Sequence, residues 1–175
     1  MARPSRRAGN LPAETTSFIG RRRVLAELRR KLGEARLVSL VGPGGVGKTR
    51  LAIRMGTDLD RCFRDGSWLV ELADLRDPVL VSNAVMAALD LRDQAGAEPL
   101  ALLLSYMRDK ELLLIVDNCE HLLEATGQLV TEIMKAGSGV RVMLIAWPTT
   151  LRGPSFGWVT GRAISRCSTC GSANT

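Results

Sequence analysis

The stretch Gly42-Pro43-Gly44-Gly45-Val46-Gly47-Lys48-Thr49 has the spacing G-x-x-x-x-G-K-[ST] of a phosphate-binding loop. It follows the apolar run at residues 37–41 and precedes residues 50–55, which have the composition of a helix. Glycines at these positions let successive backbone N–H groups curl around a phosphate chain. The helix N-terminus adds unpaired N–H donors and a partial positive charge. The sequence therefore predicts a strand, a phosphate loop and a helix that together bind a nucleotide.

Two side chains of this loop have the chemistry that a nucleotide site requires. We expect Lys48 to reach the β- and γ-phosphates and the Thr49 hydroxyl to bind Mg²⁺. An ordinary glycine-rich turn is the alternative interpretation, but the complete pattern seldom arises by chance, and more seldom directly after a strand. The predicted cofactors are ATP or ADP with Mg²⁺, and the predicted contacts are Gly42, Pro43, Gly44, Gly45, Val46, Gly47, Lys48, Thr49 and the next residue, Arg50.

The composition is typical of one globular domain. A chain of 175 residues with 46% hydrophobic residues can bury a sizeable core, and with 4% aromatic residues that core must be aliphatic. No apolar run approaches the roughly 18 residues of a membrane-spanning helix, and no apolar stretch follows the Arg-rich N-terminus to form a secretory signal. The four cysteines are irregularly spaced and do not form a disulfide framework. We expect a cytoplasmic protein without a membrane partner.

The net charge of +6 is unevenly distributed. Residues 1–36 carry ten basic and three acidic side chains. Residues 37–150 carry eleven basic and fifteen acidic side chains, and residues 151–175 carry three basic side chains and no acidic one. Basic ends can contact nucleic acid, but an Arg-rich coding bias and a solvated helix face explain them equally well. Because no aromatic residues are interleaved and no reading helix is recognisable, the sequence does not favour direct DNA binding by this chain.

Strand and helix patterns alternate along the rest of the chain. Apolar residues at helical spacing predict helices over residues 24–32, 51–59, 81–88, 99–107 and 122–133, and apolar runs predict strands over residues 37–41, 67–72, 112–116 and 140–145. Asp77 before Pro78 is typical of a helix start, with Asp77 as the N-cap. Strands separated by helices indicate right-handed βαβ units. The expected fold class is α/β, a P-loop NTPase with three α/β/α layers and a mostly parallel sheet.

One acidic residue stands where P-loop proteins bind their metal. The run at residues 112–116 is aliphatic throughout, as expected of a central strand buried on both faces, and it ends at Asp117. There Asp117 would reach the carboxyl edge of the sheet and hold Mg²⁺ directly or through water. Many strands end in Asp as a turn or a helix cap, which is the alternative. We favour the metal role for Asp117, beside Thr49.

These motifs together resemble the NB-ARC-like STAND ATPases, a branch of the AAA+-related P-loop proteins. The resemblance is to the predicted ATPase domains of bacterial LuxR-type and AfsR-type transcriptional regulators, and it covers about residues 10–145. The motif at residues 114–122 is quite specific to that group. The motifs are Asn10-Leu11-Pro12, Phe18-Ile19-Gly20-Arg21, the loop with its flanks at residues 41–52, Trp68-Leu69-Val70-Glu71-Leu72, and Leu114-Ile115-Val116-Asp117-Asn118-Cys119-Glu120-His121-Leu122.

The resemblance implies an adenine pocket and a switching function. Residues 18–21 should pack near adenine, with Ile19 and Gly20 lining its pocket. The family often has an acidic residue after the arginine, whereas this chain has Arg22. Members of the family act as slow switches: ADP keeps the module closed, and exchange for ATP opens it and promotes assembly. The implied partners are a second copy or the sensor and output domains of a regulator.

Two departures from the family pattern concern catalysis, and the first lies beside Asp117. AAA+-type enzymes usually have a second acid there, whereas Asn118 can orient water but cannot accept its proton. Glu120 is a candidate catalytic residue together with Asp117, although an acid at its position equally suits the start of a helix. We interpret His121, the only histidine, as a helix-start residue.

The second departure follows the fourth strand. The family has Thr-Ser-Arg there, to reach the γ-phosphate, whereas this chain reads Ala146-Trp147-Pro148-Thr149-Thr150, and the resemblance ends. A shifted reading frame or a truncated gene would explain this. We expect the sheet to be truncated after the fourth strand, which leaves an edge open beside residues 37–41. The expected parts are a flexible basic arm at 1–17, an incomplete nucleotide-binding domain at 18–145, and a divergent, disordered tail at 146–175 in which Cys167 and Cys170 are incidental.

Four functions are compatible with these observations. The sequence favours an ATP/ADP-binding switch module of a signal-transduction transcriptional regulator, with slow or no hydrolysis. A competent small P-loop ATPase or kinase would need a general base and a charge-stabilising arginine. A nucleic-acid-binding protein would use the basic arm, and its affinity would depend steeply on salt. A non-functional fragment of a regulator ATPase is the fourth.

Overall fold

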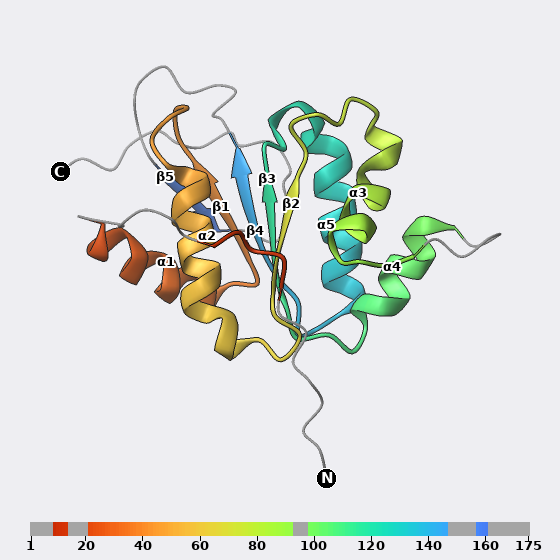
Figure 1. Cartoon of the computed structure of the whole chain (residues 1–175), viewed down its shortest axis with the longest axis horizontal. Coiled ribbons are helices and arrows are strands. Elements are labelled where there is room, and N and C mark those ends of the chain that lie inside the picture. The colour runs from red at the N-terminus through yellow and green to blue at the C-terminus, as the bar shows by residue number, and fades with distance from the viewer. Residues whose placement is uncertain (1–8, 14–20, 93–97, 147–156, 161–175) are drawn as a thin grey trace, which may run out of the picture.

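The protein is described here from a computed structural model that covers residues 9–13, 21–92, 98–146 and 157–160 (Figure 1). None of the helices within these ranges has both the length and the apolar character that crossing a membrane demands. The helices are α1 (Arg22–Glu34), α2 (Lys48–Leu59), α3 (Val81–Ala88), α4 (Pro99–Met107) and α5 (Leu123–Ala136), and the strands are β1 (Leu37–Val41), β2 (Ser67–Glu71), β3 (Leu113–Asp117), β4 (Arg141–Ala146) and β5 (Gly157–Thr160).

The strands form one sheet in the order β2-β3-β4-β1-β5. Strands β1 to β4 run parallel to one another, and β5 pairs antiparallel with β1. The fourth strand lies between β1, which leads into the phosphate loop, and β3, which ends at Asp117, so the carboxyl ends of these strands meet at one edge. The predicted α/β class with a mostly parallel sheet is confirmed.

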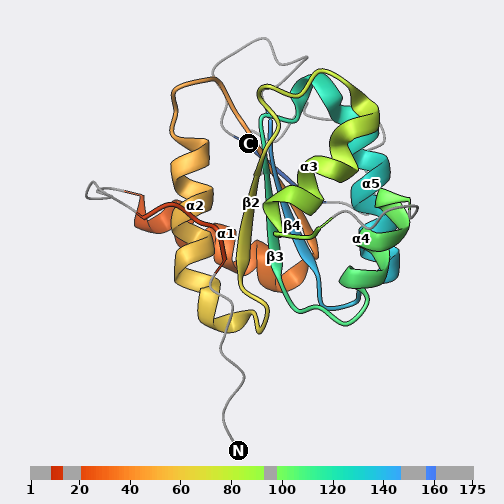
Figure 2. The ribbon, with the colours of Figure 1, turned by 45° about the vertical axis from the view of Figure 1, so that its right-hand side comes forward.

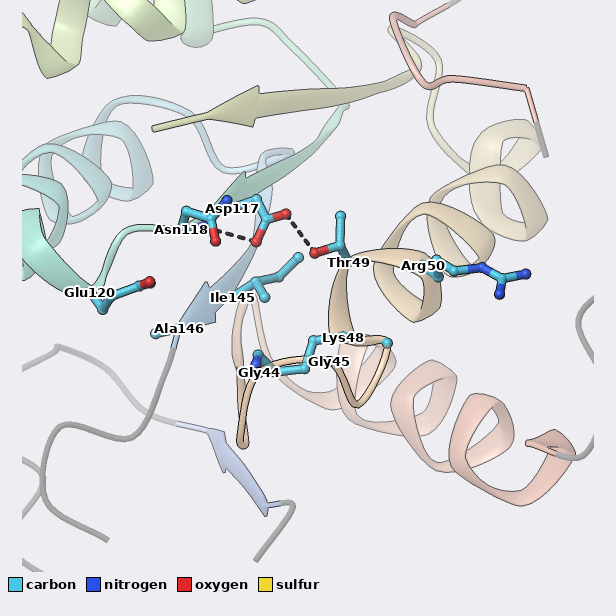
Figure 3. Close-up of a pocket in the computed structure, with 11 residues that line it drawn as sticks. Gly44, Gly45, Lys48, Thr49, Arg50, Asp117, Asn118, Glu120, Ile145 and Ala146 are labelled. Carbon is cyan, nitrogen blue, oxygen red and sulfur yellow. Dashed lines mark hydrogen bonds between the residues drawn. The ribbon is translucent and has the colours of Figure 1, made fainter. Parts of the chain in front are cut away.

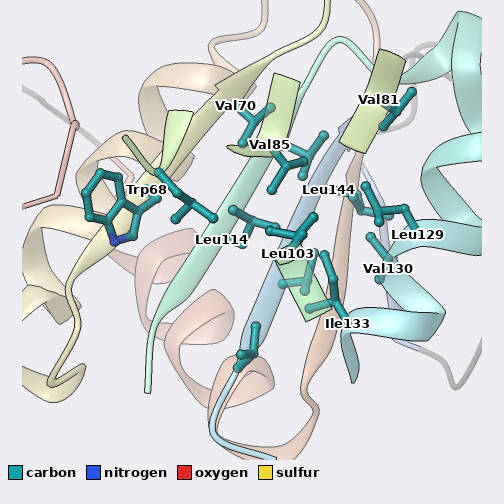
Figure 4. Packing of buried hydrophobic residues seen from close by; sticks show 14 of the residues in the cluster. Trp68, Val70, Val81, Val85, Leu103, Leu114, Leu129, Val130, Ile133 and Leu144 are labelled. Atoms are coloured by element: carbon teal, nitrogen blue, oxygen red, sulfur yellow. The ribbon is translucent and has the colours of Figure 1, made fainter. Parts of the chain in front are cut away.

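Helices cover both faces of the sheet. Helices α1 and α2 lie on one face and α3, α4 and α5 on the other (Figures 1 and 2). Side chains of β3 alternate between two hydrophobic clusters, with Leu113 and Ile115 in the cluster on the α1–α2 side. Leu114 and Val116 belong to the opposite cluster, which includes residues of α3, α4 and α5 (Figure 4). Because each face of β3 is covered, its sequence is apolar throughout rather than alternating.

The expectation of an open edge beside β1 is wrong. Residues Gly157–Thr160 form β5, which pairs antiparallel with β1 from Val38 to Val41. The stretch contains tryptophan, valine and threonine, which favour strands, but it is too short to stand out from its Gly-, Pro- and Ser-containing surroundings. The other predictions for the tail, including those for Cys167 and Cys170, concern residues outside the described ranges.

The N-terminal arm is in part attached to the domain. Of the residues expected to form a flexible arm, residues 9–13 are described, and they lie beside β2. The side-chain amide of Asn10 forms hydrogen bonds with the backbone of Leu69, and Leu11 packs against Gly56 of α2. The domain therefore begins before residue 18.

Two arginines donate hydrogen bonds to the C-terminal ends of helices, near the points where strands β1 and β4 begin. Arg36 donates to the carbonyls of Met134, Gly137 and Val140 at 2.7, 2.6 and 3.2 Å. These carbonyls belong to the end of α5 and the turn after it, where the helix itself supplies no donors. Arg141 acts in the same way on carbonyls at the C-terminal end of α1. Each arginine thus ties a helix end to the start of a neighbouring strand.

We predict that Arg36→Met destabilises the domain by about 1.5–3 kcal/mol, because it leaves carbonyls without the charged donor that satisfies them. Urea unfolding followed by circular dichroism measures this change. Arg29→Met, at an exposed position of α1, is the matched control and should change the free energy of unfolding by less than about 0.5 kcal/mol. Equal effects of the two substitutions would contradict a capping role for Arg36.

Candidate functional site

The loop between β1 and α2 adopts a conformation that requires glycine at two positions. Gly45 has φ 74° and Gly47 has φ 78°, both in the left-handed region that disfavours side chains. Gly47 is the N-cap of α2, and its carbonyl accepts from the N–H of Leu51 at 3.0 Å. The first N–H groups of α2 are consequently directed into the loop, as an anion site at a helix N-terminus requires.

Lys48 lies over this loop. Its Nζ donates to the carbonyls of Gly42 and Pro43 at 2.6 and 2.9 Å. Burial lowers the pKa of the Lys48 ammonium, while the nearby carboxylates of Asp117 and Glu120 act in the opposite direction. A phosphate at the loop would add negative charge beside this ammonium and favour its charged form.

Thr49 and Asp117 meet although they are far apart in the sequence. The Thr49 hydroxyl donates to Oδ2 of Asp117 at 2.7 Å, which joins the first turn of α2 to the end of β3 (Figure 3). The other oxygen, Oδ1, accepts from the N–H of Asn118 at 2.8 Å. Asp117 is 2% exposed, so these two donors satisfy a carboxylate that water scarcely reaches.

The donor set fits a magnesium ion held jointly with a nucleotide. A hydroxyl and a carboxylate oxygen are ligands that Mg²⁺ accepts. Within the described ranges, no three His, Cys, Asp or Glu side chains form a group that could hold a metal ion by themselves. Magnesium usually keeps several waters and binds through one or two protein groups together with substrate phosphates. Thr49 and Asp117 are compatible with that mode and not with a metal site built from protein ligands alone.

The segment after Asp117 is fixed through its backbone and a buried thiol. Asn118 has φ 54°, a left-handed conformation that asparagine tolerates better than most residues. Cys119 is fully buried, and its N–H and Sγ both lie 3.5 Å from the carbonyl oxygen of Ile145. Burial raises the pKa of the Cys119 thiol to about 12, so the thiol stays protonated near neutral pH and is a poor nucleophile. Cys119 therefore links the end of β3 to the end of β4.

A pocket of about 250 Å³ brings most of the predicted residues together. Ile145 and Ala146 are lining residues that the sequence interpretation did not assign to the site. Ala146 is the last residue of β4, and its methyl group offers no hydrogen-bond donor. The pocket is lined by Gly44, Gly45, Gly47, Lys48, Thr49, Arg50, Asp117, Asn118, Glu120, Ile145 and Ala146.

The other candidates differ in how they lie relative to this pocket. Glu120 lines it and also begins the 3-10 turn Glu120–Leu122, so its place is compatible with both sequence interpretations. Arg50 belongs to the lining, but its side chain points away from the phosphate loop (Figure 3). Nε2 of His121 lies 2.6 Å from the carbonyl oxygen of Leu75, in the loop after β2. The predicted adenine contacts Ile19 and Gly20 lie outside the described residues.

Arg21, which the sequence interpretation expected near adenine together with residues 18–20, is a neighbour of the phosphate loop. An ideal Cβ built on Gly47 would lie 3.8 Å from Nη1 of Arg21. Its guanidinium therefore borders the phosphate loop, which adds positive charge beside that of Lys48. The signal available in the sequence was its position at the end of Phe18-Ile19-Gly20-Arg21.

Comparison with protein families assigns the fold and its phosphate loop to a known family. Residues 28–153 match the family described as AAA domain. The chain belongs to this AAA domain family. The match covers the phosphate loop, both strands that carry the candidate residues, and most of the sheet, and it confirms the resemblance to AAA+-related P-loop proteins.

Several relatives of this AAA domain are bacterial regulators. It is 39% identical over 109 residues to a putative HTH-type transcriptional regulator of Mycobacterium tuberculosis, a match that covers 62% of this chain and 12% of the regulator. It is 35% identical over 121 residues to the regulatory protein AfsR of Streptomyces griseus, a match that covers 62% of this chain and 12% of AfsR. An uncharacterized protein of Mycobacterium tuberculosis is 38% identical over 121 residues, a match that covers 69% of this chain and 31% of that protein. The chain thus spans less than a third of the length of these relatives.

Solved structures confirm the fold of this AAA domain. Cdc6p of Pyrobaculum aerophilum superimposes with a TM-score of 0.57 at 16% identity, covering 79% of this chain and 41% of that protein. The ORC2 protein of Aeropyrum pernix, solved as ADPNP–ADP complexes, gives a TM-score of 0.56 at 15% identity, covering 78% and 43%. At these identities the likeness concerns the fold alone.

We predict that Asn118→Ala lowers the free energy of unfolding by about 1 kcal/mol, whereas Asn118→Gly does not, because only the alanine is strained at φ 54°. Urea unfolding of the two variants beside the parent chain measures the difference. Asp90, which has φ 55° away from the pocket, gives a matched pair in Asp90→Ala and Asp90→Gly. An equal loss for Asn118→Ala and Asn118→Gly would show that the side-chain amide matters, not the backbone conformation.

Proposed function

We propose that this AAA domain is the ATP/ADP-binding switch module of a signal-transduction transcriptional regulator, and that it hydrolyses ATP slowly or not at all. The observation that carries the proposal is the 2.7 Å contact between Thr49 and Asp117 at the edge of the phosphate loop. That contact joins the two oxygen ligands expected for Mg²⁺ beside the helix N-terminus expected for phosphate. The regulators among the relatives support the assignment to transcriptional control.

In this proposal each part of the pocket has a distinct role. The N–H groups of the loop from Gly42 to Gly47, among which Pro43 has none, hold the phosphate chain, and Lys48 neutralises the β- and γ-phosphates. Thr49 and Asp117 hold the magnesium ion, which neutralises phosphate charge when bound. Ile19 and Gly20 contact adenine, and Arg50 lies beside the phosphates through its backbone in the first turn of α2. The nucleotide-binding unit then includes the segment at residues 9–13 and the elements from α1 to β4, and the other regulator domains or a second copy are its partners in the cytoplasm.

Two of the described lining residues offer no group that would speed hydrolysis. Asn118 cannot accept a proton from the attacking water, and Ala146 cannot donate to a γ-phosphate. Binding groups that act on ADP and ATP alike give affinity without lowering the barrier to hydrolysis. This combination is expected of a switch whose state is set by nucleotide exchange.

A competent ATPase is the second candidate, and one observation favours it. Glu120 is a carboxylate that lines the pocket beside Asp117. A carboxylate within reach of a bound water can act as a general base. The rate of hydrolysis separates this candidate from the switch.

We predict that Lys48→Ala and Asp117→Asn weaken nucleotide binding in different ways. Lys48→Ala should lose about 1.5–3 kcal/mol of affinity for ATP with or without Mg²⁺, because the loss is of a charged hydrogen bond to phosphate. Asp117→Asn should lose affinity only when Mg²⁺ is present, since its carboxylate serves the metal. Titration of a fluorescent ATP analogue, in Mg²⁺ and in EDTA, measures both effects.

Lys110→Ala, on the opposite side of the domain from the pocket lining, is the control and should bind as the parent chain does. Undiminished binding by Lys48→Ala would contradict the phosphate-loop assignment. If Asp117→Asn binds normally in Mg²⁺ and merely unfolds more easily, Asp117 is a structural residue and the magnesium assignment is wrong.

We predict that the purified chain hydrolyses ATP at well under about 1 per minute, against typical enzyme turnover near 10 per second. A phosphate-release assay measures this, with Lys48→Ala as the background control. Turnover above about one per second that depends on Lys48 and is abolished in Glu120→Gln would overturn the switch proposal and establish the ATPase.

A further inference from the structure

Among the described residues, the side chain of Asn10 pairs with the outer edge of β2. Strand β2 is the last of the sheet on its side. The N–H of Leu69 donates to Oδ1 of Asn10 at 2.6 Å, and Nδ2 of Asn10 donates to the carbonyl of Leu69 at 2.8 Å. The carboxamide of Asn10 thus accepts and donates as the peptide group of a neighbouring strand would.

The residues on either side of Asn10 hold it in place. An ideal Cβ on Gly9 would lie 1.7 Å from the carbonyl oxygen of Ser67, so this position accepts only glycine. Leu11 packs against the cluster of the α1–α2 face. A third hydrogen bond, of 3.3 Å, joins Nδ2 of Asn10 to the carbonyl of Ala88. We call residues 9–11 the edge cap.

In the part of the chain that the structure describes, β2 has little other protection against pairing with another strand. Its sequence Ser67-Trp68-Leu69-Val70-Glu71 contains no proline and no lysine, and only Glu71 is exposed. Exposed edge strands are ordinarily protected by such residues, by bulges or by a covering segment. Aromatic and β-branched residues favour strand pairing further. Here the edge cap supplies the protection.

We infer that the edge cap keeps β2 from pairing with β2 of a second copy of this chain. Leu69 is the central residue of β2 and directs both its N–H and its C=O outward. In an antiparallel pair about a two-fold axis, Leu69 faces its own copy and exchanges both hydrogen bonds with it. In this register Ser67 faces Glu71, so no like charges oppose one another.

This interaction surface is separate from the proposed nucleotide-binding function. None of the residues of the edge cap or of β2 lines the pocket. A failure of nucleotide binding would leave the inference intact, and a failure of the inference would leave the nucleotide site intact.

The test removes the cap chemistry from the full chain. Asn10→Ala and the isosteric Asn10→Asp both lose the donor to the Leu69 carbonyl, and Pro12→Ala, at an exposed neighbouring position, is the control. Size-exclusion chromatography with light scattering over a wide range of concentration gives the dimer dissociation constant. We expect both Asn10 variants to dimerise with a dissociation constant at least roughly tenfold lower than that of the parent chain and Pro12→Ala. If Asn10→Ala does not fold, Asn10→Asp carries the comparison.

A second substitution locates the contact on β2. The backbone N–H groups of successive residues in β2 point alternately toward β3 and away from it. The N–H of Leu72 donates to the carbonyl of Asp117 at the end of β3, at 3.0 Å, so the N–H of Glu71 points away from β3, as that of Leu69 does. Glu71→Pro therefore removes an outward donor that a paired copy would use and leaves the β3 pairing intact. In the Asn10→Asp background it should restore the monomer, and hydrogen exchange at Leu69 should be slow only in the dimer.

Two results would overturn the inference. One is an unchanged dissociation constant in the folded Asn10 variants. The other is a dimer that persists in Asn10→Asp with Glu71→Pro while the Leu69 amide exchanges quickly, because the copies would then associate through another surface.

Discussion

The enclosure of β3 on every side governs the arrangement of this domain. Strands β2 and β4 pair with its two edges, and hydrophobic clusters cover its two faces. None of its five residues is more than 2% exposed. Every position must accordingly be apolar unless a polar group finds partners inside the protein. Asp117, the last residue, is the exception, and the hydroxyl of Thr49 is the partner that the fold brings to it.

The pocket follows from that one buried carboxylate. To satisfy Asp117, the first turn of α2 must dock against the end of β3, and this fixes the phosphate loop above the sheet. The parallel register of β1 with β4 sets Ala146 beside Val41, where the loop begins. The contact of Cys119 with the Ile145 carbonyl then joins the segment after β3 to the end of β4. Three neighbouring strand ends thus form one surface, at the edge where parallel sheets place their ligands.

Local patterns were sufficient for the features that depend on local sequence. The aliphatic run before Asp117 and the glycine spacing of the loop identified β3, β1 and α2. Asp77 does cap a helical turn, since its side chain accepts from the N–H of Val79 at 3.0 Å, although that turn is the 3-10 segment Pro78–Leu80 that precedes α3. The α/β class followed because each of these patterns occurs on contiguous residues.

Features that depend on distant partners were missed. Asn10 and Leu69 are 59 residues apart, so an asparagine in a Pro-containing segment gave no sign of a strand edge. Arg36 reaches carbonyls about a hundred residues away, and its role was invisible among many arginines. Strand β5 has four residues and pairs only because β1 offers an edge. In each case a backbone group that the sheet or a helix leaves unpaired selects its partner, and unpaired backbone groups appear only once the fold exists.

The pocket contains more groups suited to binding a nucleotide than groups suited to hydrolysing it. The described residues include the groups proposed to hold the phosphates and Mg²⁺ of a nucleotide in its ground state: left-handed glycines at the loop, Lys48 on its carbonyls, and the oxygens of Thr49 and Asp117. Groups that would act only in the transition state are few among the described lining residues, where Glu120 is the single carboxylate besides Asp117. Interactions shared by the ground and transition states raise affinity but do not accelerate the reaction. In the proposed switch, a pocket of this composition would distinguish nucleotides by binding, and its output would come from the different conformations that the bound nucleotides stabilise.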